Sequence, residues 1–145
     1  MAGVQAPSPD LAGEITGQLL DIGYALRQRL DAEVARLGLT PATARALSEL
    51  DPDRPSPARD LALQLDCDRS NVTPLVDRLE EARLVERRVD PEDRRVKTLV
   101  VTEAGRRMQA RLHRVLAECG AILGDLDEAE LRVLRDALAK VAIPQ

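Results

Sequence analysis

The sequence predicts a mainly α-helical protein that carries one small β-hairpin, and three observations support this fold class. Apolar residues recur every three or four positions over most of the 145 residues, which is the period of an α-helix. Two β-prone runs at 84–89 and 96–101 flank the charged turn DPEDRR, as in a hairpin. Tyr24 is the only aromatic residue, so the core must be built from aliphatic side chains, which suits packed helices.

The composition predicts one domain in a reducing compartment. Hydrophobic residues make up 44% of the chain, enough for a core of its own. Residues 1–10 are expected to form a flexible tail and residues 11–145 a single domain. The segment MAGVQAPSPD has no basic stretch followed by an apolar run, so export is not expected, and no apolar run approaches the roughly 18–20 residues that cross a bilayer. Cys67 and Cys119 lie far apart and make no disulfide framework. We therefore expect a cytoplasmic protein that has no membrane partner.

Long helices are predicted at both ends of the domain. The first covers residues 11–37, where apolar residues step by three or four along one stripe, and Gly38 is a suitable stop. Two more helices are expected at 103–124 and 127–143, the second opened by a capping box that begins at Asp127.

These end segments also predict self-association. The helices within 11–38 and 103–143 carry more apolar surface than a compact three-helix module can cover. Pairing with a second copy would bury that surface, and two-fold pairing is the commonest solution. We therefore expect them to be the dimerisation helices of a homodimer.

Three short helices are predicted between the end segments. The first opens at the Thr40–Pro41 cap and the second at a similar signal, Ser56–Pro57. The third covers about 69–82, and Pro74 favours a start at Ser70, because the missing N–H of a proline costs little in the first turn. Three helices followed by a two-stranded wing describe a winged helix-turn-helix, here over residues 39–102.

The third helix has one apolar and one polar face. Short hydrogen-bonding groups gather near its N-terminus, the end that meets base edges in the major groove in helix-turn-helix proteins. Arg78 can pair with guanine or a phosphate, and Asn71 can read adenine. The alternative is that Ser70 and Asn71 only cap the helix and that Arg78 pairs with a nearby carboxylate. The candidate DNA-binding residues of this helix are Arg69, Ser70, Asn71, Thr73, Pro74 and Arg78.

Basic residues gather around the hairpin although the formal net charge is −4. Residues 83–107 hold eight basic and five acidic side chains, so a basic strip lies on an acidic body and can hold phosphates. Arginines at the hairpin tip can reach a narrow minor groove. The alternative is an ordinary solvated turn. The candidate residues of the wing are Arg88, Asp93, Arg94, Arg95 and Lys97.

In combination, these segments resemble the MarR (multiple antibiotic resistance regulator) family. The most specific pieces are the third-helix phrase DRSNVTPLVDRLEEARLVER, the wing phrase DPEDRR and the closure from Thr102 to Gly105. Within the wing phrase, Asp93 and Arg95 stand in a D-x-R pattern. The resemblance covers residues 39–105.

The resemblance implies a homodimeric repressor. The first and last helices of two subunits would interlock and present two winged modules to a pseudo-palindromic operator in double-stranded DNA. A small ligand or an oxidant would release the DNA by changing the spacing of the modules. The resemblance makes Asp93 the partner of Arg95, and it places the ligand pocket between the dimer helices and the winged module, near Tyr24, Ala25 and Leu47.

Other classes of function receive little support from the sequence. No glycine-rich phosphate loop, nucleophile elbow or histidine-based dyad is visible, and His113 is the only histidine. We therefore expect no enzyme, no metal site and no cofactor. Cys67 and Cys119 are interpreted as small buried hydrophobes, with Cys67 the better placed for thiol reactivity. The remaining alternative is a winged helix that binds another protein without reading DNA.

Overall fold

The computed structural model describes residues 8–141 and confirms the predicted fold class. The helices are α1 (Pro9–Arg36), α2 (Pro41–Glu49), α3 (Ala58–Gln64), α4 (Arg69–Glu81), α5 (Glu103–Cys119), the 3-10 helix η1 (Gly120–Leu123) and α6 (Glu128–Leu138). The strands are β1 (Ser56–Pro57), β2 (Val85–Val89) and β3 (Lys97–Val101). Most of the tail expected over 1–10, and the last part of the helix expected over 127–143, lie outside the described residues.

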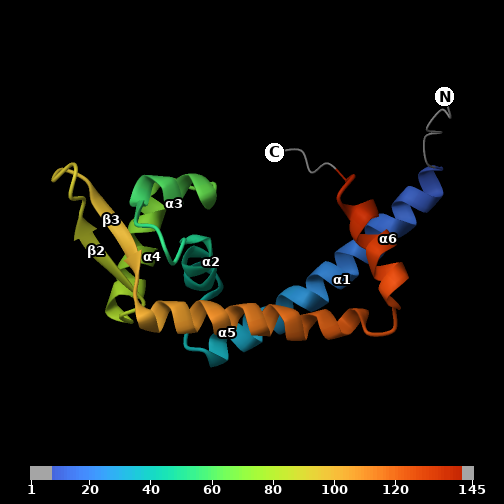
Figure 1. Ribbon diagram of the computed structural model, residues 1–145. Coiled ribbons are helices and arrows are strands. Elements are labelled where there is room, and N and C mark those ends of the chain that lie inside the picture. Colours follow the sequence, from blue (N-terminus) through green and yellow to red (C-terminus); the bar gives the residue numbers. More distant parts are fainter. Residues whose placement is uncertain (1–7, 142–145) are drawn as a thin grey trace.

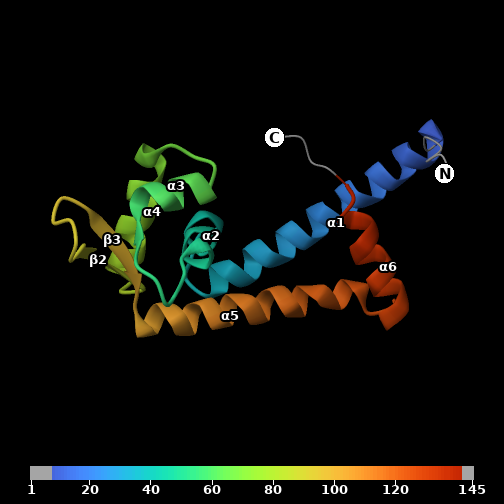
Figure 2. The same cartoon turned by 45° about the horizontal axis from the view of Figure 1, so that its top comes forward.

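The molecule has a winged module at one end and long helices that lead away from it (Figure 1). α2, α3 and α4 pack together beside the hairpin of β2 and β3. α1 and α5 contact each other where they join the module, and α6 lies at the far end of the molecule from the wing (Figure 2). None of the helices between residues 8 and 141 is both long and apolar enough to span a membrane.

The sheet has one strand more than the sequence predicts. The three strands are antiparallel in the order β1-β3-β2, and β2 is therefore an edge strand. Ser56 was expected to cap the second short helix, but it pairs with Leu99 of β3 instead. α3 consequently begins at Ala58, with Pro57 as an N-cap that makes no side-chain bond.

Local capping signals were predicted well. Thr40 and Thr43 form a capping box at the start of α2, and Asp127 forms one with Glu130 at the start of α6. α1 begins two residues before the predicted position, because Ser8 accepts a hydrogen bond from the Leu11 N–H. These caps satisfy backbone N–H groups that have no partner within the helix.

Further predicted helix boundaries were wrong. The helix expected over 127–143 ends at Leu138, although the structure describes the chain as far as residue 141. The helix expected over 103–124 ends at Cys119 and continues as η1. The third short helix begins at Arg69 rather than Ser70, after the extended residue Asp68, so that Pro74 lies inside it. Pro74 cannot donate the bond that the carbonyl group of Ser70 would otherwise accept.

The hydrophobic core lies in the winged module. Val72, Val76 and Leu79 of α4 are buried there, as the helical period predicts. α1 contributes one buried residue, Val34, and α6 contributes none. The large apolar side chains that stay exposed on α1 and α6 are Leu11, Ile15, Leu19, Leu20, Ile22, Val133 and Leu138.

Candidate DNA-binding surface

The N-terminal half of α4 presents a polar face to solvent. The helix follows a tight turn in which Asp66 has a φ of 50°. Because the apolar face is buried, all six predicted residues of the helix are exposed: Arg69, Ser70, Asn71, Thr73, Pro74 and Arg78. The Thr73 hydroxyl donates to the carbonyl of Arg69 at 3.2 Å.

The capping alternative for this face is not what the structure shows. Asp68 is the N-cap residue, and no side-chain bond caps the helix. Within residues 8–141, no hydrogen bond or ion pair engages the side chains of Ser70, Asn71 or Arg78. These groups are therefore available to a partner.

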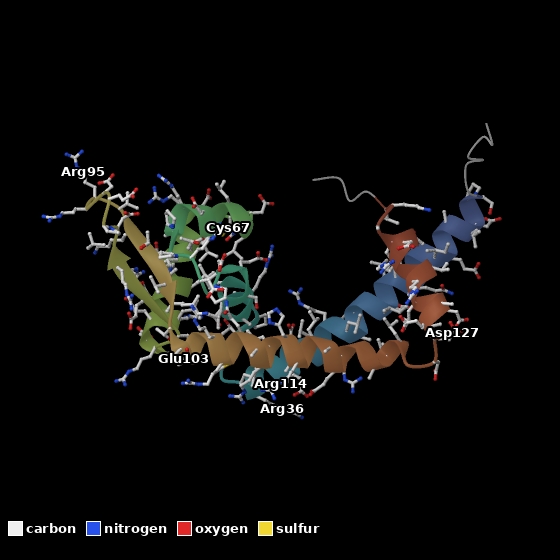
Figure 3. The ribbon with its side chains drawn as sticks, in the orientation of Figure 1. Arg36, Cys67, Arg95, Glu103, Arg114 and Asp127 are labelled. Carbon is white, nitrogen blue, oxygen red and sulfur yellow. The ribbon has the colours of Figure 1, made fainter. Side chains whose placement is uncertain are left out.

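Two aspartates build the tip of the wing. Asp90 accepts from the N–H groups of Glu92 and Asp93, at 2.8 and 3.3 Å, and Asp93 accepts from the N–H of Arg95 at 2.9 Å. Such aspartate turns hold the backbone and leave the following side chains free. Arg94 and Arg95 are exposed, and Arg95 extends from the tip (Figure 3). Asp93 is thus a partner of Arg95, as the resemblance implies, and the contact is to the backbone N–H of Arg95.

The two other basic residues predicted for the wing differ in their surroundings. Arg88 donates to Glu86, two residues away on the same strand, at 2.9 Å. Lys97 begins β3 and is exposed, and no ion pair involves it in the described part of the chain. The charge of Arg88 is therefore partly balanced, whereas that of Lys97 is not.

Arg87 connects the wing to α4, and the sequence did not predict this contact. Its guanidinium group donates to Asp77 at 2.5 Å and to Glu80, while its backbone N–H donates to Glu80 Oε1 at 3.2 Å. The hydrogen bond to Asp77, reinforced by Glu80, raises the pKa of Arg87 above its usual value despite partial burial. The partners are seven and ten residues away, so no short motif could have revealed the cluster.

The base of the wing is fixed to the start of α5. The Thr102 hydroxyl donates to the carbonyl of Arg83 at 2.7 Å and accepts from the N–H of Gly105 at 3.0 Å. A Cβ atom on Gly105 would lie 2.1 Å from the carbonyl oxygen of Leu84. The predicted closure from Thr102 to Gly105 is thus a close backbone contact that needs glycine.

α5 is also fixed to α2. Gln109 is buried, and its amide donates to the carbonyl groups of Leu47 and Leu50, both at 2.8 Å. Arg106, one turn earlier, donates to Asp53 at 2.8 Å and to the carbonyl of Pro52. These bonds add partners to carbonyl groups at and after the end of α2, where the Leu47 carbonyl also accepts from the Leu50 N–H at 3.4 Å.

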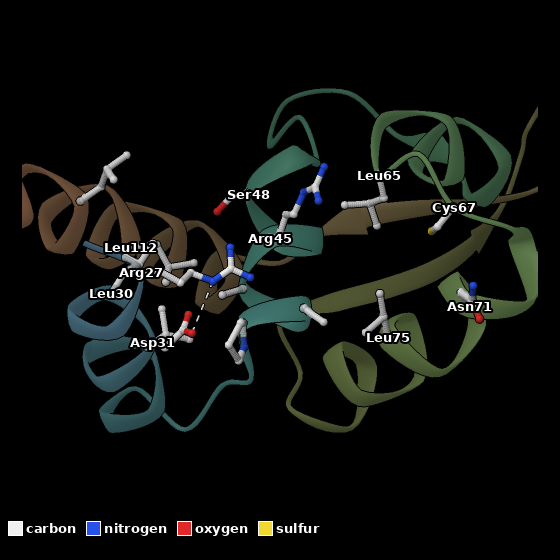
Figure 4. Close-up of a pocket in the computed structure, with 15 residues that line it drawn as sticks. Arg27, Leu30, Asp31, Arg45, Ser48, Leu65, Cys67, Asn71, Leu75 and Leu112 are labelled. Carbon is white, nitrogen blue, oxygen red and sulfur yellow. Dashed lines mark ion pairs between the residues drawn. The ribbon is translucent and has the colours of Figure 1, made fainter. Parts of the chain in front are cut away.

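A cavity of about 720 Å³ lies between the long helices and the winged module (Figure 4). It is lined by residues of α1, α2, α4 and α5, among them Asn71 of the polar α4 face. An ion pair between Arg27 and Asp31, at 3.4 Å, lies at its α1 side. Cys67 lines the same cavity and is partly buried, while Cys119 is buried as predicted.

The pocket residues implied by the family resemblance do not line this cavity. Tyr24 is 66% exposed, Ala25 is also exposed, and Leu47 is fully buried in the core. The cavity lies further along α1 than Tyr24, and Leu47 faces inwards from α2. Among the described residues, no group of histidine, cysteine and acidic side chains is arranged to hold a metal ion.

Three short helices and an arginine-tipped hairpin, with a polar helix face beside it, define a winged helix-turn-helix. The family model for the MarR family matches residues 37–96 of the chain. The match falls on the winged helix-turn-helix, the part of the chain whose sequence pattern resembles this family. No curated protein matches the sequence significantly.

Solved structures extend the likeness beyond the winged module. The YusO protein from Bacillus subtilis is 26% identical, with a TM-score of 0.78 over 94% of this chain and 100% of that one. A MarR-family transcriptional regulator from Rhodococcus sp. RHA1 is also 26% identical, with a TM-score of 0.71 over 95% and 100%. A mutant of MepR from S. aureus, bound to an oligodeoxyribonucleotide, is 22% identical, with a TM-score of 0.67 over 87% and 94%. The chain has the fold of MarR-family transcription regulators over nearly its whole length.

Proposed function

We propose that the chain represses transcription by binding a pseudo-palindromic operator in duplex DNA as a homodimer. The observation that carries this proposal is a set of exposed side chains on two adjacent elements that have no hydrogen-bond or ion-pair partner within residues 8–141. Arg78 is exposed on α4 and Arg94 is exposed in the turn between β2 and β3. Arg95 lies at the tip of the wing (Figure 3). A similar fold in MepR is bound to an oligodeoxyribonucleotide, which adds support.

In this proposal α4 reads base edges while the wing holds the backbone nearby. Arg78 donates to a guanine or a phosphate, Asn71 pairs with adenine, and the wing arginines enter a minor groove. The DNA contacts come from Arg69, Ser70, Asn71, Thr73, Pro74 and Arg78 on α4 and from Arg88, Arg94, Arg95 and Lys97 on the wing, whose turn is held by Asp93.

The homodimer is supported by the uncovered apolar side chains of α1 and α6. Val133, for example, is 70% exposed, and no residue of α6 is buried. A second copy that covered both helices would bury these side chains. A two-fold pair places its recognition helices roughly 34–36 Å apart, one turn of DNA.

Release by a small ligand or an oxidant is supported by the cavity. Its volume of about 720 Å³ falls in the usual range for small-molecule sites. Because Asn71 and Leu75 of α4 line it together with Leu30 of α1, a bound ligand would contact both the recognition helix and a long helix. Cys67 in the same lining is the residue that an oxidant would modify.

The proposal is tested by fluorescence anisotropy with the promoter region of the protein's own gene at several salt concentrations. A DNA-binding protein releases counterions, so the affinity should fall steeply as salt rises. Arg95→Ala should weaken binding to all sequences and lower the salt slope by about 1. Arg78→Ala should instead cost about 1–3 kcal/mol at particular base pairs. Lys140→Ala, which removes one positive charge at the far end of the molecule, is the matched control.

Two results would contradict the proposal. The first is binding that is no stronger to the promoter than to a polyanionic competitor. The second is an affinity that does not respond to salt or to Arg95→Ala. Either result would favour a winged helix that binds another protein.

A further inference from the structure

Two carboxylates on α4 stand close to the proposed DNA-binding surface. Asp77 and Glu80 have side chains that are 51% and 40% exposed, on the helix that carries Arg78. Negative charge near phosphates opposes DNA binding, so these residues need another role. An ionised carboxylate can only accept hydrogen bonds, and both of these carboxylates accept from Arg87 of β2.

The position of β2 explains why Glu80 is well placed for such a role. β2 is an edge strand, and Arg87 pairs with Leu99 of β3. Just outside the two strands, the Leu84 carbonyl accepts from the N–H of Thr102, and the N–H of Asp90 donates to the carbonyl of Val96. In an antiparallel pair such bonded positions alternate with unbonded ones, so the N–H of Arg87 points away from β3. Glu80 accepts that N–H at 3.2 Å and so takes the place of a neighbouring strand.

The guanidinium group of Arg87 adds a second attachment. It joins Asp77 and Glu80, which lie three residues apart on one face of α4. The Arg87 side chain is 27% exposed, so the arginine end of these pairs is partly shielded from water, while the two carboxylates are more exposed. β2 is thus held to α4 through its backbone and through a side chain at the same residue. Two attachments at one point restrict the rotation of the strand, and the wing tip continues from that strand.

We propose that Glu80 and Asp77 are positioning residues that set the direction of the wing relative to α4 by holding Arg87. They contact no DNA themselves, and Arg87 serves as their link rather than as a phosphate ligand. This inference rests on the proposed function, because it concerns how the wing arginines reach the DNA backbone.

The test compares Glu80→Ala with Glu81→Ala in the same salt titration. Glu81 is exposed on the same helix and makes no ion pair within the described residues, so both variants remove one negative charge. Charge alone predicts tighter DNA binding for both. The proposal predicts that Glu80→Ala binds about tenfold more weakly, with a salt slope lowered by about 1 because a wing phosphate contact is lost. Glu81→Ala should bind as tightly as the unaltered protein or more tightly.

Two further variants separate positioning from general stability. Glu80→Gln keeps an oxygen for the Arg87 N–H and should recover part of the affinity. Arg87→Lys keeps the charge but lacks the planar fork that reaches two carboxylates, so it should behave like Glu80→Ala. Far-UV circular dichroism checks that each variant is folded. In the Glu80→Ala background, Arg95→Ala should have a smaller effect than it has alone, because the wing is already misplaced.

The outcomes distinguish this inference from the proposed function. If Glu80→Ala binds like Glu81→Ala, and Arg95→Ala has its full effect in both, the inference is wrong while the DNA-binding proposal stands. If the unaltered protein shows no salt-dependent binding, the proposed function fails and the inference fails with it.

Discussion

Gly105 lies where the base of the wing meets α5, and the space there admits no side chain. A Cβ atom would lie 2.1 Å from the Leu84 carbonyl oxygen and 2.7 Å from a methyl group of Val101. The first neighbour is backbone and cannot rotate away. The residue therefore fixes how closely the hairpin approaches the helix.

Gly105→Ala should consequently destabilise the protein. Overpacking usually costs about 1–3 kcal/mol, and we expect the upper end of that range because backbone must shift. Urea unfolding followed by circular dichroism measures the change. Gly120→Ala is the control, since nothing lies within 4 Å of its Cβ position. An unchanged unfolding midpoint for Gly105→Ala would contradict the packing described here.

Residue roles were predictable from the sequence where they depend on near neighbours. The exposure of Ser70 and Arg78 follows from the helical period, and the turn that contains Asp93 follows from the charged run DPEDRR between two β-prone runs. The side chain of Asp93 has two possible targets on Arg95, and spacing alone does not decide between them. The ion pairs of Arg87 with Asp77 and Glu80 form only when α4 and β2 are packed together. No local sequence pattern specifies that packing.

Among the elements, α4 is unusual because it contains Pro74 five residues after its first residue. The proline removes one backbone bond and crowds the carbonyl of Ser70. The helix nevertheless keeps its buried face, so packing of Val72, Val76 and Leu79 outweighs the loss.

Pro74→Ala should therefore stabilise the protein, because alanine restores the N–H and fits the helix better. We expect a gain of about 1–2 kcal/mol, less than the full difference in helix propensity since packing already holds the helix. Differential scanning calorimetry measures it, with Thr73→Ala as the control on the same exposed face. A lower melting temperature for Pro74→Ala would show that the proline fits this position better than the helix geometry suggests.

Elements with strong local signals were predicted closely, and the others were not. The hairpin was found because two β-prone runs flank a charged turn, and the capping boxes lie within four residues. β1 was missed because Ser56–Pro57 carries a helix-cap signal, which pairing with β3 overrides. A strand of two residues exists only through its partner.

At the scale of the whole molecule, the long helices leave apolar side chains uncovered. In a homodimer these side chains form the interface, and folding becomes linked to association. The melting temperature should then rise with protein concentration, and sedimentation should give twice the mass of one chain.

Leu19→Glu places a charge among the apolar residues of α1 and should shift the protein towards the monomer. Gln18→Glu adds the same charge at the neighbouring position and should leave the dimer intact. A melting temperature independent of concentration, or a single chain in sedimentation, would contradict the homodimer.

The arrangement of the whole molecule was the hardest part to predict. The sequence indicated long end helices, but where they cross the module depends on packing between distant segments. The pocket expected near Tyr24, Ala25 and Leu47 therefore does not coincide with the cavity between the long helices and the winged module. The position of the cavity depends on how α1 packs against α2 and α5. No single segment of the sequence specifies that packing.

The buried amide of Gln109 has a mechanical consequence. The Gln109 amide donates to two carbonyl groups at the end of α2. The first turns of α5 and the winged module therefore move as one rigid body. A hinge motion at that junction would leave the buried Gln109 amide without its hydrogen-bond acceptors, which costs free energy. Any opening or closing of a pair of such modules must therefore bend the molecule beyond Gln109, in the second half of α5 or along α1.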